Sequence, residues 1–98
     1  MKMFIDIHDA ANGTLPAGLT EGQFQAVYRQ YAEACREEGV TSLRASVGLG
    51  QGRVFCVSLA PDEEAVRRAH ERIGLTYDSI TEVTDVSSFS MLLAQPAA

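Results

Sequence analysis

Residues 3–8 read Met-Phe-Ile-Asp-Ile-His, and this stretch decides the fold. Its side chains alternate with a period of two, which is typical of a β-strand with two unlike faces. If Ile5 and Ile7 face the core, then Phe4, Asp6 and His8 share the opposite face. The sequence therefore predicts a first strand that carries a carboxylate and an imidazole on one surface.

Four further segments show regular periodicity between start and stop signals. Capping residues precede the two helical patterns, a glycine follows each of them, and β-branched residues mark the last strand. These segments are a helix between Thr20 and Gly39, a hairpin of residues 42–49 and 54–59, a helix between Asp62 and Gly74, and a strand over 79–86. Ile80 and Val83 lie on opposite parities in that strand, which indicates a bulge or a two-sided environment.

The resulting order, βαββαβ, predicts an α+β fold of the ferredoxin-like type. In that plan a four-stranded antiparallel sheet carries both helices on one face. We expect one domain over residues 1–98, with a core of residues 1–86 and a C-terminal tail of residues 87–98. The tail is apolar, so we expect part of it to pack on this subunit or on a neighbour.

Composition limits the classes of partner. The 98 residues carry a formal net charge of −5 without a basic stretch, which argues against nucleic acid. Asp6 interrupts the first apolar run before a signal peptide or membrane span is complete, so we expect a cytoplasmic protein that does not bind membranes. Residues 9–19 form a long loop of the kind that often borders a site.

The predicted topology brings three ligand types together. With Ile5, Ile7, Phe55, Val57 and Leu59 assigned to the helices, the uncovered face holds Phe4, Asp6, His8, Ser42, Arg44, Ser46, Val54, Cys56 and Ser58. Opposite residues of antiparallel strands have Cβ atoms roughly 4.5 to 5.5 Å apart, so His8 and Cys56 can bind a common ion with Asp6 nearby. Nitrogen, sulfur and oxygen ligands suit nickel, copper or zinc. Alternatively, these residues are semi-polar side chains at a dimer interface.

Three segments resemble a known family. They are residues 4–8 (Phe-Ile-Asp-Ile-His), residues 54–58 (Val-Phe-Cys-Val-Ser), and residues 64–75 followed by Glu82-Val83. Their order and spacing resemble the small bacterial nickel-binding, nickel-responsive proteins of ferredoxin-like fold. The resemblance implies a homodimer that binds a nickel ion through side chains of these segments.

His70 has two interpretations. The second helix covers the opposite side of the predicted sheet, so His70 is not expected to join His8 and Cys56 in one site. It is then a boundary residue, hydrogen-bonded to Tyr77 or to a backbone carbonyl, or a ligand of a second site. The resemblance favours its inclusion among the metal ligands.

Three functions compete. The first is a homodimeric metal-binding protein, with nickel as the expected metal, that stores, buffers or senses the metal without catalysis. The second is a dimeric α+β barrel enzyme, such as a cofactor-independent monooxygenase or an isomerase, with His8 as base or haem ligand and loop 9–19 closing a pocket. The third is an interaction module. No second histidine adjoins His8 and no tryptophan is present, so the sequence favours the first function.

Overall fold

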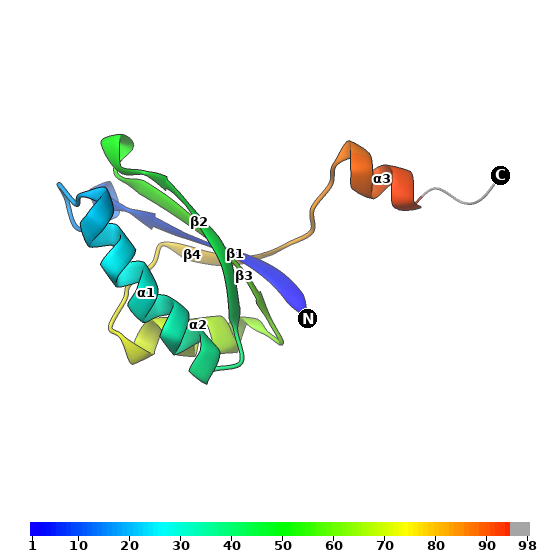
Figure 1. Ribbon diagram of the computed structural model, residues 1–98, viewed down its shortest axis with the longest axis horizontal. Coiled ribbons are helices and arrows are strands. Elements are labelled where there is room, and N and C mark those ends of the chain that lie inside the picture. Colours follow the sequence, from blue (N-terminus) through cyan, green and yellow to red (C-terminus); the bar gives the residue numbers. More distant parts are fainter. Residues whose placement is uncertain (95–98) are drawn as a thin grey trace.

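A computed structural model describes residues 1–94 of the protein (Figure 1). Seven helices and strands follow one another, with short 3-10 turns at Ala10–Asn12 and Leu49–Gln51. In chain order they are β1 (Lys2–Asp9), α1 (Glu21–Glu37), β2 (Thr41–Gly48), β3 (Arg53–Ala60), α2 (Glu63–Arg72), β4 (Ser79–Val83) and α3 (Ser88–Ala94).

The four strands form one antiparallel sheet in the order β2-β3-β1-β4. The predicted α+β class and four-stranded antiparallel sheet are therefore confirmed. β1 lies inside the sheet, between β3 and β4, and Figure 1 shows α1 and α2 next to each other on one side of it. A side chain of β1 that points to this side is consequently enclosed by the sheet below and by two helices above.

Both long helices begin where the capping residues predicted. The Thr20 side chain accepts a hydrogen bond from the Gln23 backbone, and the Gln23 side chain accepts one from the Thr20 backbone, which completes a capping box. Asp62 caps α2 through the Ala65 amide. The Asp62 cap fixes the residue at which α2 begins, and hence the position along β1 over which its last turn lies.

The covered face of the sheet is the opposite of the predicted one. Phe4, Asp6 and His8 lie beneath the helices with at most 2% of their surface exposed, and Val54, Cys56 and Ser58 of β3 are buried with them. Ile5, Ile7 and Phe55 point to the uncovered side, where Phe55 is 38% exposed. The alternation correctly predicted which residues share a face, but it did not determine which face the helices cover.

A bulge in β2 places Ser42 on one face of the sheet and Arg44 and Ser46 on the other, although all three were predicted to share the uncovered face. The register shifts between Ser42 and Arg44, so Ser42 pairs with buried Ser58, whereas Arg44 pairs with Val57 and Ser46 with Phe55. Arg44 and Ser46 are thus on the uncovered side as predicted, and Ser42 is not.

Strand β4 is two-sided, as its parities indicated. Ile80 is opposite Asp6 and packs on the core, whereas Val83 is opposite Met3 on the other face. The strand ends at Val83, three residues before the predicted end.

The C-terminal tail contains α3, whose apolar side chains do not join the core. Phe89, Met91, Leu92 and Leu93 are each 59–69% exposed, so the expected packing on this subunit is not seen for them. The end of the tail, residues 95–98, lies outside the described residues. No helix within residues 1–94 is long and apolar enough to span a membrane.

Candidate metal centre

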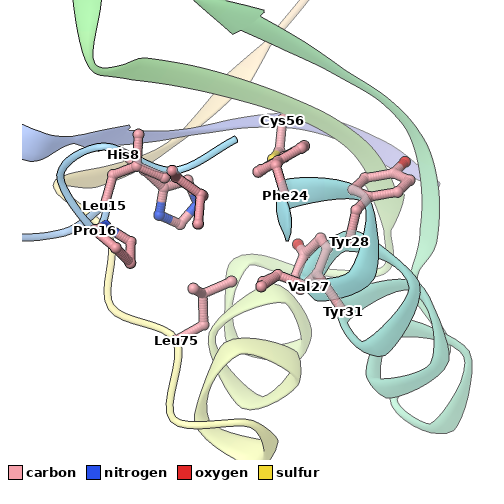
Figure 2. Close-up of a pocket in the computed structure, with 10 residues that line it drawn as sticks. His8, Leu15, Pro16, Phe24, Val27, Tyr28, Tyr31, Cys56 and Leu75 are labelled. Atoms are coloured by element: carbon pink, nitrogen blue, oxygen red, sulfur yellow. The ribbon is translucent and has the colours of Figure 1, made fainter. Parts of the chain in front are cut away.

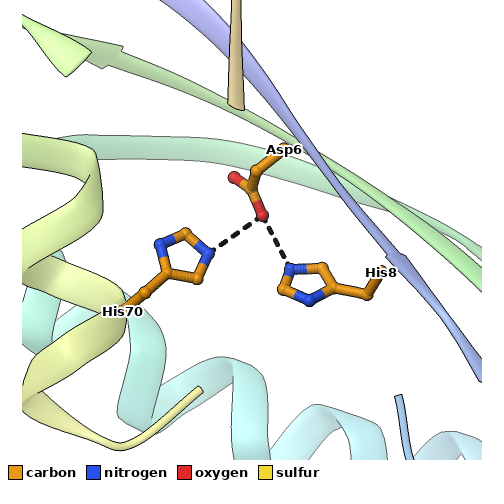
Figure 3. Close-up of side chains that lie close together, drawn as sticks. All are labelled: Asp6, His8 and His70. Atoms are coloured by element: carbon orange, nitrogen blue, oxygen red, sulfur yellow. Dashed lines mark hydrogen bonds and ion pairs between the residues drawn. The ribbon is translucent and has the colours of Figure 1, made fainter. Parts of the chain in front are cut away.

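Three side chains from two elements meet between the sheet and α2. Asp6 and His8 are two residues apart on β1 and point to the same face, and His70 comes down from the last turn of α2 (Figure 3). One ligand atom from each residue lies within 4.8 Å of the other two. All three residues are buried, so the cluster is shielded from bulk water.

A single carboxylate oxygen is shared by both imidazoles. Oδ2 of Asp6 lies 2.7 Å from Nε2 of His8 and 3.0 Å from Nε2 of His70. The two rings stack with their centroids 5.5 Å apart. Both Nε2 atoms therefore point at the same carboxylate oxygen, as the dashed lines in Figure 3 show.

Backbone carbonyls determine which ring nitrogen faces this point. Nδ1 of His8 donates to the Thr76 carbonyl oxygen at 2.7 Å, and Nδ1 of His70 donates to the Val66 carbonyl oxygen at 2.8 Å. Because a carbonyl oxygen only accepts, Nδ1 carries hydrogen in both rings, and Nε2 supplies the lone pair once its own proton leaves. Metal-ligating histidines are oriented in this way in most known sites.

The other oxygen of the Asp6 carboxylate makes no hydrogen bond in the described chain. Oδ1 is buried and has no hydrogen-bond partner among residues 1–94. An unsatisfied buried carboxylate oxygen is unfavourable, because its hydration is lost without replacement. A cation at this position would restore that lost interaction.

Burial and pairing oppose each other in the pKa values of this cluster. Burial by itself raises the pKa of Asp6, but the hydrogen bonds from His70 and His8 outweigh it, so the pKa lies below its usual range. Burial lowers the pKa of His8, yet the Asp6 hydrogen bond and charge outweigh it, and the pKa is raised. Asp6 is therefore ionised at neutral pH, as a metal ligand must be.

Aromatic rings and a thiol enclose the cluster. The Tyr31 and Tyr77 rings lie 4.7 and 5.0 Å from the His70 ring, centroid to centroid. Cys56 is opposite Asp6 across β1 and β3, and burial raises the pKa of its thiol well above the usual range. Cys56 therefore lies beside the cluster as a neutral group at physiological pH.

The sequence of the chain matches a known family over most of its length. The model of the family described as "Nickel responsive protein SCO4226-like" matches residues 4–83, which include all three clustered side chains. The chain belongs to this family. A comparison with curated proteins finds no match.

A solved structure of the SCO4226-like family shows the same fold. The crystal structure of SCO4226 from Streptomyces coelicolor A3(2) is 29% identical in sequence, with a TM-score of 0.73. The match covers 87% of this chain and 99% of that one. The family match ends at residue 83, before α3 begins.

The structure brings together three of the four residues predicted as metal ligands. The expectation that His70 lies apart from His8 was wrong, because His8 points toward α2 and not away from it. His8 is opposite Val54 and not Cys56, and within the described part of the chain Cys56 is outside the three-residue cluster. A direct role of Cys56 stays a prediction.

One sequence signal would have located His70 correctly. His70 follows Ala69 on the apolar stripe of α2 and is four residues after Val66, both of which are fully buried. An imidazole on a buried stripe needs a polar partner on the surface below. Asp6 and His8 share one face in the middle of β1, so this requirement favours that face as the one under α2.

Proposed function

We propose that this protein binds a divalent nickel ion through Asp6, His8 and His70, and that it stores, buffers or senses the metal without catalysis. The observation that supports the proposal is the convergence of two Nε2 atoms and Oδ2 around one point, with both Nδ1 atoms held by carbonyls. A site of two imidazoles and one carboxylate suits first-row transition metals better than it suits calcium or magnesium, which prefer oxygen ligands. Family membership favours nickel among those metals.

Cys56 has a subsidiary place in this proposal. Its register position opposite Asp6 brings a thiol to the edge of the cluster, and a bound metal favours the thiolate form of a neighbouring cysteine. We therefore keep Cys56 as an additional ligand, ranked after the two histidines and Asp6.

The test is nickel titration by calorimetry on metal-free protein purified without a histidine tag. The chain has only two histidines, so His8→Ala and His70→Ala each remove half of its imidazole donors. We expect each substitution, and Asp6→Asn, to weaken nickel binding by at least a hundredfold, because second-shell changes alone cost 10- to 100-fold. Full affinity in either histidine variant would contradict the shared site.

Matched controls separate ligand loss from general damage. Asp85→Asn removes an exposed carboxylate, and its nickel affinity should equal that of the wild type. Cys35 and Cys56 are both buried free thiols, so Cys35→Ser is the control for Cys56→Ser. If both serine variants bind nickel equally, Cys56 is not a ligand and the three-residue site remains.

We also propose a homodimer of ferredoxin-like subunits, each a single domain with its core in residues 1–86. Phe4 and Val54 do not contribute to its contact surface, since both lie under the helices of their own chain. A different apolar surface supports the dimer. Six apolar residues keep accessible surface on the uncovered side of the sheet, whereas Val57 on that side is only 4% exposed. They are Met3, Ile5, Ile7, Phe55, Leu59 and Val83.

An apolar sheet face of this kind is normally covered by a second sheet, because two sheets that stack about 10 Å apart exclude water from between their apolar side chains.

The test of the dimer is light scattering at micromolar concentration on wild type and on Ile7→Glu. We expect a dimer for the wild type and a monomer for the variant, while Arg44→Glu, at the rim of the same face, stays dimeric. A monomeric wild type with the same fold would overturn the dimer.

A further inference from the structure

The candidate metal centre is sealed, so an ion cannot reach it unless part of the protein moves. The side chains of Asp6, His8 and His70 are each at most 3% exposed. The His8 ring lines an apolar cavity of about 140 Å³, and Figure 2 shows it next to Leu15 and Pro16 on the cavity wall. In the described chain, Asp6 and His70 are not wall residues. The cavity therefore leads to the cluster through His8.

The closed cavity is not itself a path for a hydrated metal ion. Apart from the His8 ring its walls are mainly apolar, with Phe24 and Val27 of α1 on one side and Leu75 on the other. A divalent ion that entered this space would lose its hydration without replacement, which is strongly unfavourable. Exchange of the metal therefore requires a wall to open and admit water.

Loop 9–19 is the wall of this cavity that has room to move. It contributes wall residues such as Leu15 and Pro16, whereas most of the others belong to α1 or to the sheet. Gly13 and Gly18 flank this part of the loop, with φ of +76° and +71°, and a Cβ at either position would meet no atom within 4 Å. Glycine adopts both signs of φ without strain, so these two positions suit the hinges of a moving loop.

Two hydrogen bonds tie the loop to the chain before β4, and we call them the Asp78 latch. The Thr14 hydroxyl donates to one oxygen of the Asp78 carboxylate at 2.7 Å, and the Asn12 side-chain amide donates to the other at 2.8 Å. Asp78 is itself anchored, because its backbone N–H donates to the Ile7 carbonyl oxygen of β1 at 2.7 Å. The loop therefore borders a cavity, as expected from its length, and the latch holds it closed.

We propose that loop 9–19 is a gate: it swings about Gly13 and Gly18, opens the cavity to water, and lets nickel reach and leave the cluster at His8. This inference rests on the proposed nickel site and adds the control of its exchange rate. The latch residues are not metal ligands. Weakening the latch destabilises the closed loop whether or not metal is bound, so association and dissociation accelerate by the same factor.

The first test uses metal-free protein with a chelator present. Diethyl pyrocarbonate labels accessible imidazoles, and because the chain has two histidines, mass spectrometry assigns the label to His8 or to His70. Thr14→Val removes the latch hydroxyl without a change of charge, and it should speed labelling of His8 by about two- to tenfold, the value of one hydrogen bond. Asn12→Ala removes the other bond and should act in the same direction. Thr84→Val, at an exposed threonine outside the loop, should label like the wild type.

His70 is the internal reference for this experiment. It is fully buried and does not line the cavity, so its labelling should stay at the wild-type rate when only the loop opens. General unfolding of a variant would instead speed labelling of both histidines. The comparison of the two residues thus separates opening of the gate from loss of stability.

The second test measures nickel exchange by stopped-flow tyrosine fluorescence, with a chelator added to start dissociation. The Tyr31 and Tyr77 rings lie next to the His70 ring, so nickel bound at the cluster should quench them. Thr14→Val should speed association and dissociation by the same two- to tenfold factor and leave Kd unchanged. Thr84→Val should keep both wild-type rates.

The outcomes distinguish the gate from the metal site. The gate is overturned if Thr14→Val and Thr84→Val label His8 equally, or if labelling of His8 and His70 rises together. Wild-type exchange rates in Thr14→Val, at wild-type affinity, overturn the gate alone. A wild type that binds no nickel overturns the metal site itself.

Discussion

Replacing Asp6 by Asn tests the electrostatics of the buried cluster without any metal. The substitution keeps the shape of the side chain and removes its charge from between two imidazoles, 2.7 and 3.0 Å away. The loss of one partner from a fully buried ion pair costs about 3–5 kcal/mol, because the remaining charge is stranded. For a domain of this size that corresponds to a fall in Tm of ~20 °C.

The penalty should depend on pH in a defined direction. Asp6 raises the pKa of His8, so the pair stabilises the wild type fully below the ordinary histidine pKa, and this contribution is lost as pH rises through the raised value. In Asp6→Asn the His8 pKa is no longer raised by that charge. The difference in unfolding free energy between the two proteins should therefore be largest near pH 6 and should shrink by pH 9.

The assay is urea unfolding followed by circular dichroism, with a chelator present, at pH 6 and at pH 9. Asp85→Asn, an exposed change of the same kind, should stay within about 0.5 kcal/mol of the wild type at both values. The reasoning is refuted if Asp6→Asn matches Asp85→Asn at pH 6, or if its penalty grows as pH rises.

Three further outcomes are expected. Nickel affinity, measured by calorimetry, should rise between pH 6 and pH 8, because the metal competes with the proton that Asp6 holds on His8. The rise should be up to about tenfold per pH unit for each proton displaced. An affinity independent of pH would contradict this. Gly52→Ala should lower the unfolding free energy by about 1 kcal/mol or more in urea melts, since Gly52 has φ +69° and a new Cβ would lie 3.0 Å from that of Ala10. Asp78→Ala should make loop 9–19 more sensitive to limited proteolysis, because the contact with Thr14 is lost. Hydrogen bonds from Thr14 and Asn12 lower the Asp78 pKa, so in the wild type their contribution to holding the loop should be lost only as pH falls through that lowered pKa. Equal cleavage of both proteins at pH 7 would disprove the role of Asp78 in holding the loop.

Local patterns predicted the elements well because the signals are local. Thr20 and Asp62 cap the helices that they were expected to cap, and the alternation from Met3 to His8 gave a strand of eight residues, Lys2–Asp9. The partition of side chains between two faces also followed from the period of two. These features depend only on neighbours in the chain.

The side of the sheet that the helices cover could not be predicted in the same way. Both faces of β1 carry apolar residues, so hydropathy alone did not distinguish the Phe4 face from the Ile5 face. The deciding contacts are between residues 64 positions apart, Asp6 and His70, which satisfy each other's polarity under the helices. The Thr76 carbonyl that orients His8 depends on the path of the chain after α2, for which the sequence has no marker.

The distance along the chain between the donors has a consequence for synthesis. Asp6 and His8 leave the ribosome early, but their partner on α2 follows more than sixty residues later, and β1 gains its first sheet neighbour only when β3 arrives. A growing chain therefore has two of the three donors but lacks the neighbouring strand and helix that hold them in place. The complete set exists only after α2 has docked, so an occupied site would mark a molecule that has finished folding.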